Sequence, residues 1–88
     1  MYSYEIQPSL QKILNKLFSK DKALYEQVLK KIEEVMTSSD IEHYKNLRFD
    51  MKDKKRAHIG HFVLVFAVDH ERKTVSFEDY DHHDKIYQ

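Results

Sequence analysis

The longest apolar run in the chain is Phe62-Val63-Leu64-Val65-Phe66-Ala67-Val68. It is rich in aromatic and β-branched residues, which favour strands, and it is far shorter than the ~20 residues that a membrane-spanning helix needs. It ends at the polar segment Asp69-His70-Glu71-Arg72, which we interpret as a hairpin loop. We therefore expect a strand over this run and a second strand from Thr74 to Tyr80, where apolar and polar residues alternate again.

Toward the N-terminus the pattern indicates a short strand followed by two helices. Tyr2, Tyr4 and Ile6 alternate with polar residues, which is typical of a half-buried strand, and Pro8 ends it. Apolar residues then recur at helical spacing in two stripes. The stripes are Leu10, Ile13, Leu14, Leu17 and Phe18, and Leu24, Tyr25, Val28, Leu29, Ile32, Val35 and Met36. The short break at residues 19–21 predicts an antiparallel helical hairpin that ends at about Thr37.

The segment between the helices and the apolar run carries the rest of the predicted sheet. We expect a loop at Ser38-Ser39-Asp40, a strand from Tyr44 to Phe49, and a polar turn at residues 50–54 that leads through residues 56–59 to Gly60. Three strands joined by short loops form an antiparallel meander, because parallel strands need long crossovers. The predicted fold is therefore one α+β domain over residues 1–88: an N-terminal strand, a helical hairpin and a β-meander, with both helices on one face of a single sheet.

This layer count leaves one face of the sheet without a helix. On the apolar run, Phe62, Leu64, Phe66 and Val68 point one way, and Val63, Val65 and Ala67 point the other. Apolar side chains on the uncovered face either form an exposed patch that binds a partner, or are covered by the C-terminal residues Ile86 and Tyr87. The sequence supports both readings equally.

Composition narrows the classes of function. The chain has no cysteine, which excludes disulfides, thiolate metal sites and cysteine nucleophiles, and its first residues lack the pattern of a secretory signal, so we expect a cytoplasmic protein. Its formal net charge is zero, whereas nucleic-acid binders usually carry a basic excess. RNA binding would thus require basic residues concentrated on one face, and a candidate cluster is Lys45, Arg48, Lys52, Lys54, Lys55 and Arg56. The alternative is that this cluster is only a solvated turn.

The element order and two motifs together resemble the RelE/ParE superfamily of toxins. The first motif is Arg56-Ala57-His58-Ile59-Gly60-His61-Phe62, which matches a pattern of basic-x-basic-aliphatic-Gly with an aromatic residue two positions later. The second is His83-Asp84-Lys85-Ile86-Tyr87, which matches a C-terminal basic residue with an aromatic residue four positions on. His58, His61 and His83, and His43 more loosely, resemble the histidine usage of the YafQ branch of RelE-like proteins, in which histidines do the acid–base work.

The resemblance implies the toxin of a type II toxin–antitoxin pair that cleaves mRNA on the ribosome, with a cognate antitoxin as partner and no cofactor. The implied catalytic residues are Arg56, His58 and His83, and the implied RNA-binding residues are Lys45, Arg48, His61 and Tyr87. Val63 is a departure, because many RelE-like nucleases have an arginine at that position. The alternative is a ParE-like gyrase inhibitor or a non-catalytic binding module of the same fold.

The residue types fit metal-independent RNA cleavage. That reaction needs a base for the 2′-hydroxyl, an acid for the 5′ leaving oxygen and a cation for the charge on phosphorus. Histidine suits both proton roles, since its ordinary pKa is about 6.5, and arginine suits the third. Arg56 and His58 would share one face of a strand. A competing metal-ligand cluster at residues 79–84 is weakened because adjacent His82 and His83 would point in opposite directions on a strand.

Overall fold

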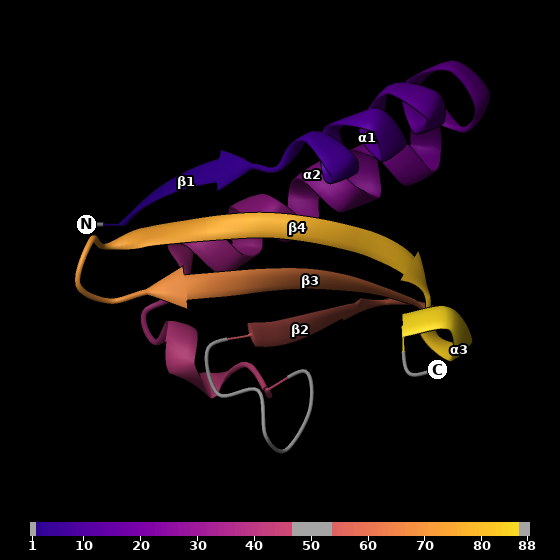
Figure 1. The fold of residues 1–88 in the computed structure, drawn as a ribbon. Helices are drawn as coiled ribbons and strands as arrows, with labels where there is room; N and C mark the ends of the chain where they lie inside the picture. The colour runs from indigo at the N-terminus through magenta and orange to yellow at the C-terminus, as the bar shows by residue number, and fades with distance from the viewer. Residues whose placement is uncertain (1, 47–53, 87–88) are drawn as a thin grey trace.

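The computed structural model describes residues 2–46 and 54–86. Strands β1 (Ser3–Ile6), β4 (Thr74–His82), β3 (Phe62–Asp69) and β2 (Lys54–Ile59) lie in this order in one sheet. Helices α1 (Pro8–Lys20) and α2 (Lys22–Thr37) pack together on one face of it, and the short helix α3 (His83–Ile86) follows β4 (Figure 1). The predicted α+β class, the helical hairpin and the one-sided placement of its helices are confirmed. No helix in these residues is both long and apolar enough to cross a membrane.

The helical hairpin begins and turns where the sequence predicts. Pro8 occupies the first turn of α1, where its missing N–H leaves no hydrogen bond unmade. Asp21 serves both helices: its backbone N–H donates to the Leu17 carbonyl at 2.8 Å, and its side chain accepts from the Leu24 N–H at 3.1 Å. One residue therefore ends α1 and caps α2, which is why the break between the two apolar stripes is so short.

The inner face of the sheet packs against the helices around a single core. β3 pairs antiparallel with both β2 and β4, as expected for a meander, whereas β1 pairs parallel with β4, with Ser3 opposite Thr74. The connection from β1 to β4 contains both long helices and strands β2 and β3, so it is long enough for parallel pairing. The core consists of the buried residues Leu10, Leu14, Val28, Ile32, Val35, Ala57, Leu64, Phe66, Val68, Val75, Phe77 and Tyr80.

The strand expected from Tyr44 to Phe49 is wrong in its described part. A 3₁₀ turn, η1 (Ile41–His43), precedes it, and Tyr44 and Lys45 are not in a strand. Asn46 forms only an isolated bridge with Lys55, and residues 47–53 lie outside the described part of the chain. The first strand of the meander is instead β2, which starts at Lys54, a residue that we had placed in the preceding turn.

The face of the sheet away from α1 and α2, called here the open face, does not expose its valines. Val63 is fully buried and Val65 is 5% exposed. Helix α3 contacts both β3 and β4, and Ile86 and Val65 line the same shallow hollow of about 320 Å³. The sequence left two alternatives for this face, an exposed apolar patch or a cover formed by Ile86 and Tyr87. Ile86 does cover it, while Tyr87 lies outside the described residues.

Candidate active site

The open face holds the two basic residues of the first motif. Arg56 pairs with Val65 and His58 with Val63, so both side chains lie on the face that the helices leave uncovered. Their neighbours in the strand, Lys55 and Ala57, point the other way and are buried. The strand alternation that the sequence predicted for positions 56 and 58 is therefore present.

His83, which begins the C-terminal motif, lies near His58 at this face of the sheet. Gly60, at φ 62°, makes the tight turn between β2 and β3. The backbone N–H of His83 donates to the His61 carbonyl in this turn at 2.9 Å, which ties the start of α3 to the turn. The His58 and His83 rings then lie 5.9 Å apart between centroids, at an angle of 24°. Figure 1 shows α3 at this end of the sheet, opposite the β3–β4 hairpin.

The electrostatics of His58 tie four residues together. His58 is exposed, yet partial desolvation of its imidazole lowers its pKa, and the positive charges of Arg56, His83 and Lys45 lower the pKa further, in that order. A lowered pKa favours the neutral ring, which can accept a proton near neutral pH. Arg56, His58 and His83 thus meet at one place, with Lys45 close enough to act on it, and together they make the candidate active site.

The sequence predicts four RNA-binding residues, and two of them, Lys45 and His61, lie in the described part of the chain. Lys45 is exposed, and its backbone carbonyl accepts from the Arg56 N–H at 3.0 Å. His61 is exposed at the β2–β3 turn, but its ring lies beside that of His82, with centroids 6.3 Å apart, and not in the His58–His83 pair. Arg48 and Tyr87 lie outside the described residues.

Carboxylates occupy the far side of the same face. Asp81 lies opposite Val63 and Asp79 opposite Val65, so β3 separates them from His58 and Arg56. Next to them, Glu78 forms an ion pair with Lys54. Within residues 2–46 and 54–86, no group of three His, Asp or Glu side chains is arranged to hold a metal ion. The suspected cluster at residues 79–84 is divided, because Tyr80 and His82 point to the helix side of β4.

Two residues near the site carry features that the sequence reading missed. His82 pairs with His61 and also makes an edge-to-face contact with Phe62. The sequence assigns Lys55 to a basic cluster that either binds RNA or is a solvated turn, and both alternatives place it at the surface, yet it is only 4% exposed. The sequence did contain a signal for this burial. Side chains alternate along a strand, so Lys55 points to the same side as Ala57 and Ile59, which face the core.

Comparisons with known proteins agree with this architecture. No protein-family model matches the chain. A Methanocaldococcus jannaschii protein named "Putative toxin RelE4" is 54% identical over all of this chain and 93% of its own length. The isolated E. coli RelE toxin superposes with a TM-score of 0.72 at 25% identity, covering 93% of this chain and 84% of that one. RelE in the intact E. coli RelBE toxin–antitoxin complex gives the same score and identity over 93% and 96% of the two chains. The chain belongs to the RelE family of toxins.

Proposed function

We propose that this chain is the toxin of a type II toxin–antitoxin pair and that it cleaves mRNA on the ribosome, in the cytoplasm, without a metal ion. The observation that carries the proposal is the meeting of the His58 and His83 rings, 5.9 Å apart, beside the charge of Arg56. Two imidazoles and a guanidinium can supply the base, the acid and the cation that transesterification of RNA uses. The solved E. coli relative in complex with its antitoxin supports an antitoxin partner for this chain.

The pKa of His58 suggests how the proton roles divide. Because the pKa of His58 is lowered, its ring is suited to take the proton from the 2′-hydroxyl. The 2′-oxygen then attacks phosphorus, Arg56 stabilises the added negative charge, and the bond to the 5′-oxygen breaks as His83 donates a proton to that oxygen. The products are a 2′,3′-cyclic phosphate and a 5′-hydroxyl. Lys45 holds a flanking phosphate, and His61, Arg48 and Tyr87 remain proposed RNA contacts.

Val63 bears on where the stabilising charge comes from. Many RelE-like nucleases place an arginine at this position, whereas here the side chain is a fully buried valine opposite His58. The proposed site therefore depends on Arg56 for the charge on phosphorus. We expect loss of this guanidinium to reduce the rate of RNA cleavage severely, since no second arginine on the described part of the open face could replace it.

The test is controlled expression with mapping of transcript ends on ribosomes, and purified protein assayed on programmed ribosomes. His58→Ala and His83→Ala should each reduce cleavage by a factor of about 10² to 10⁴, the usual contribution of general acid–base catalysis. Lys12→Gln, at an exposed position of α1 on the other side of the sheet, is the control and should cleave normally. If transcripts are still cut by both alanine variants, the acid–base assignment is wrong.

A second function is favoured by the carboxylates of the open face. Asp79 and Asp81 lie across β3 from the basic residues and would repel a phosphate backbone that extended over the whole face. This charge division suits a protein partner, as in a ParE-like gyrase inhibitor or a binding module. The same expression experiment separates these alternatives from the nuclease. Intact transcripts together with a DNA-damage response would indicate a gyrase inhibitor. Intact transcripts without a DNA-damage response would indicate a binding module.

A further inference from the structure

The side chain of Lys55 is buried on the side of β2 that faces the core. It lies opposite Phe66 in the sheet and its side chain is 5% exposed, whereas that of Lys54, one residue earlier, is 37% exposed. A buried ammonium group is tolerated only when its donors are satisfied. The contacts of the Lys55 ammonium group therefore indicate its structural role.

Three acceptors surround the ammonium group, and all come from one short segment. The Nζ atom of Lys55 donates to the Asn46 Oδ1 at 3.1 Å and to the Tyr44 carbonyl at 3.3 Å. It also lies 3.5 Å from the Glu42 carboxylate. An ammonium group has three N–H donors, so these contacts account for all of them. Lys55 thus binds residues 42, 44 and 46, which flank Lys45.

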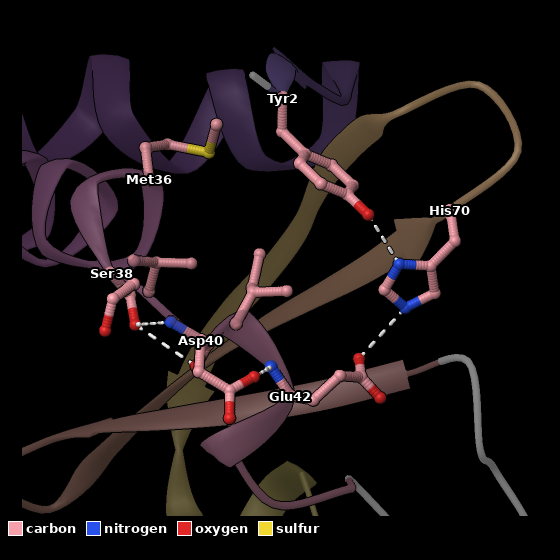
Figure 2. A pocket seen from close by; sticks show the side chains of 9 residues that line it. Tyr2, Met36, Ser38, Asp40, Glu42 and His70 are labelled. Atoms are coloured by element: carbon pink, nitrogen blue, oxygen red, sulfur yellow. Dashed lines mark hydrogen bonds and ion pairs between the residues drawn. The ribbon is translucent and has the colours of Figure 1, made fainter.

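Beside these polar contacts, the segment packs on the sheet through Tyr44, whose ring lies edge to face against Phe66 of β3 with centroids 5.6 Å apart. Asn46 forms an isolated bridge with Lys55, and the Lys45 carbonyl accepts from the Arg56 N–H. At its start, Glu42 is held from a second side: Figure 2 shows the Tyr2 hydroxyl on one nitrogen of His70 and the Glu42 carboxylate on the other, at 2.6 and 3.0 Å. The Glu42 carboxylate therefore links the hairpin end of the sheet to Lys55.

We infer that Lys55 is a positioning residue for the candidate active site: its buried ammonium group holds residues 42–46 against β2 and thereby sets the place of Lys45 beside His58. The inference rests on the proposed function only in naming this cluster an RNA site. Lys45 is exposed and its charge is one of those that lower the pKa of His58. Displacing the segment should therefore change the titration of His58, although Lys55 itself lies on the other side of the strand.

The experiment is an NMR titration of the His58 ring in the free protein, with Lys55→Met as the variant. Methionine keeps most of the length of the side chain and removes the charge, so no unpaired ammonium remains. We expect the pKa of His58 to rise toward its ordinary value, by no more than it rises in Lys45→Met. Lys54→Met removes a neighbouring charge on the open face, which is not among the causes of the His58 shift, and should leave the titration unchanged.

A double variant separates positioning from a direct effect of charge. In a Lys45→Met background, Lys55→Met should cause no further change, because its effect passes through Lys45. An unchanged His58 pKa in Lys55→Met, or the same rise in both backgrounds, would overturn the inference. If Lys55→Met does not fold, Asn46→Ala removes one acceptor and should give a smaller rise, and no rise would overturn the inference equally.

Activity is read separately from this titration. In the ribosome assay, the fold increase in KM caused by Lys55→Met should be several times the fold decrease in kcat. The reason is that Lys45 is proposed to bind a phosphate and not to transfer a proton. A protein that does not cut RNA but shows the expected His58 titration would refute the proposed nuclease and leave the positioning role of Lys55 intact. The converse result, normal KM with an unshifted His58, would remove Lys55 from the site.

Discussion

At the scale of single residues, His58 has the most altered environment in the candidate site. His58 lies exposed on the open face, yet partial desolvation of its ring lowers its pKa below 6.5, and the charges of Arg56, His83 and Lys45 lower it further. A base with a lowered pKa stays neutral to lower pH. If His58 is the base, the acid limb of the cleavage profile should therefore lie below pH 6.5, since activity is lost only when this ring becomes protonated.

Arg56→Gln tests this dependence on pH. Removing the guanidinium takes away one of the causes that lower the pKa of His58, so the pKa rises. The acid limb of kcat/KM should move to higher pH, and the maximal rate should fall because the charge on phosphorus loses its cation. Profiles of kcat/KM against pH for both proteins provide the measurement. An unmoved limb with a reduced maximum would mean that His58 does not titrate in that limb.

Tyr80 is a residue whose polar group the fold does not use, as far as the described residues show. It is 4% exposed and stacks on Phe62, and burial raises the pKa of its hydroxyl to about 12. None of the described residues gives that hydroxyl a hydrogen bond. Tyr80→Phe keeps the stacked ring, so the free energy of unfolding should rise by about 1 kcal/mol. Urea denaturation measures it, and a comparable loss would reveal a partner for the hydroxyl.

At the scale of elements, the junction between α1 and α2 depends on Asp21. Its carboxylate accepts from the Leu24 N–H at the start of α2. Asp21→Ala should lower the free energy of unfolding by about 1 kcal/mol, the usual cost of losing an N-cap, and Asp21→Asn should restore most of it. Thermal unfolding of the three proteins tests this. Equal stability of the alanine and asparagine variants would mean that the cap contributes little.

At the scale of the whole molecule, the sheet separates two environments. Helices α1 and α2 bury one face, while the open face carries Arg56 and His58 on β2 and carboxylates on β4, with the buried valines of β3 between them. Formal neutrality is thus compatible with a local basic site, because the opposite charges lie on different strands. RNA binding should be confined to the β2 side.

Chelation tests the chemistry proposed for this molecule as a whole. The proposed reaction uses imidazole and guanidinium groups alone, so cleavage should be unchanged when the purified toxin is treated with a chelator. The toxin should be freed of chelator before it is assayed on programmed ribosomes, since ribosomes themselves need magnesium. Loss of activity that zinc or manganese restores would revive a metal site at residues 79–84.

Much of the fold is determined locally and could be predicted from the sequence alone. Helical and alternating periods identified both helices, the apolar strand β3 and most of β4, and the residue spacing put Arg56 and His58 on one face. These features depend on neighbours within a few positions, which a sequence displays directly. The family resemblance then pointed to His83, which no local pattern connects to His58.

The remaining features depend on contacts between distant parts of the chain. The parallel pairing of β1 with β4, the cover that α3 provides and the distance between the His58 and His83 rings all join segments far apart in sequence. Lys55 is the clearest case. A charged residue beside a polar turn is expected to be solvated, and only the three oxygen acceptors brought by residues 42–46 make its burial favourable. The sequence alone determined helices α1 and α2 and strands β3 and β4, and tertiary structure decided which charges could be buried, since that depends on acceptors that other segments supply.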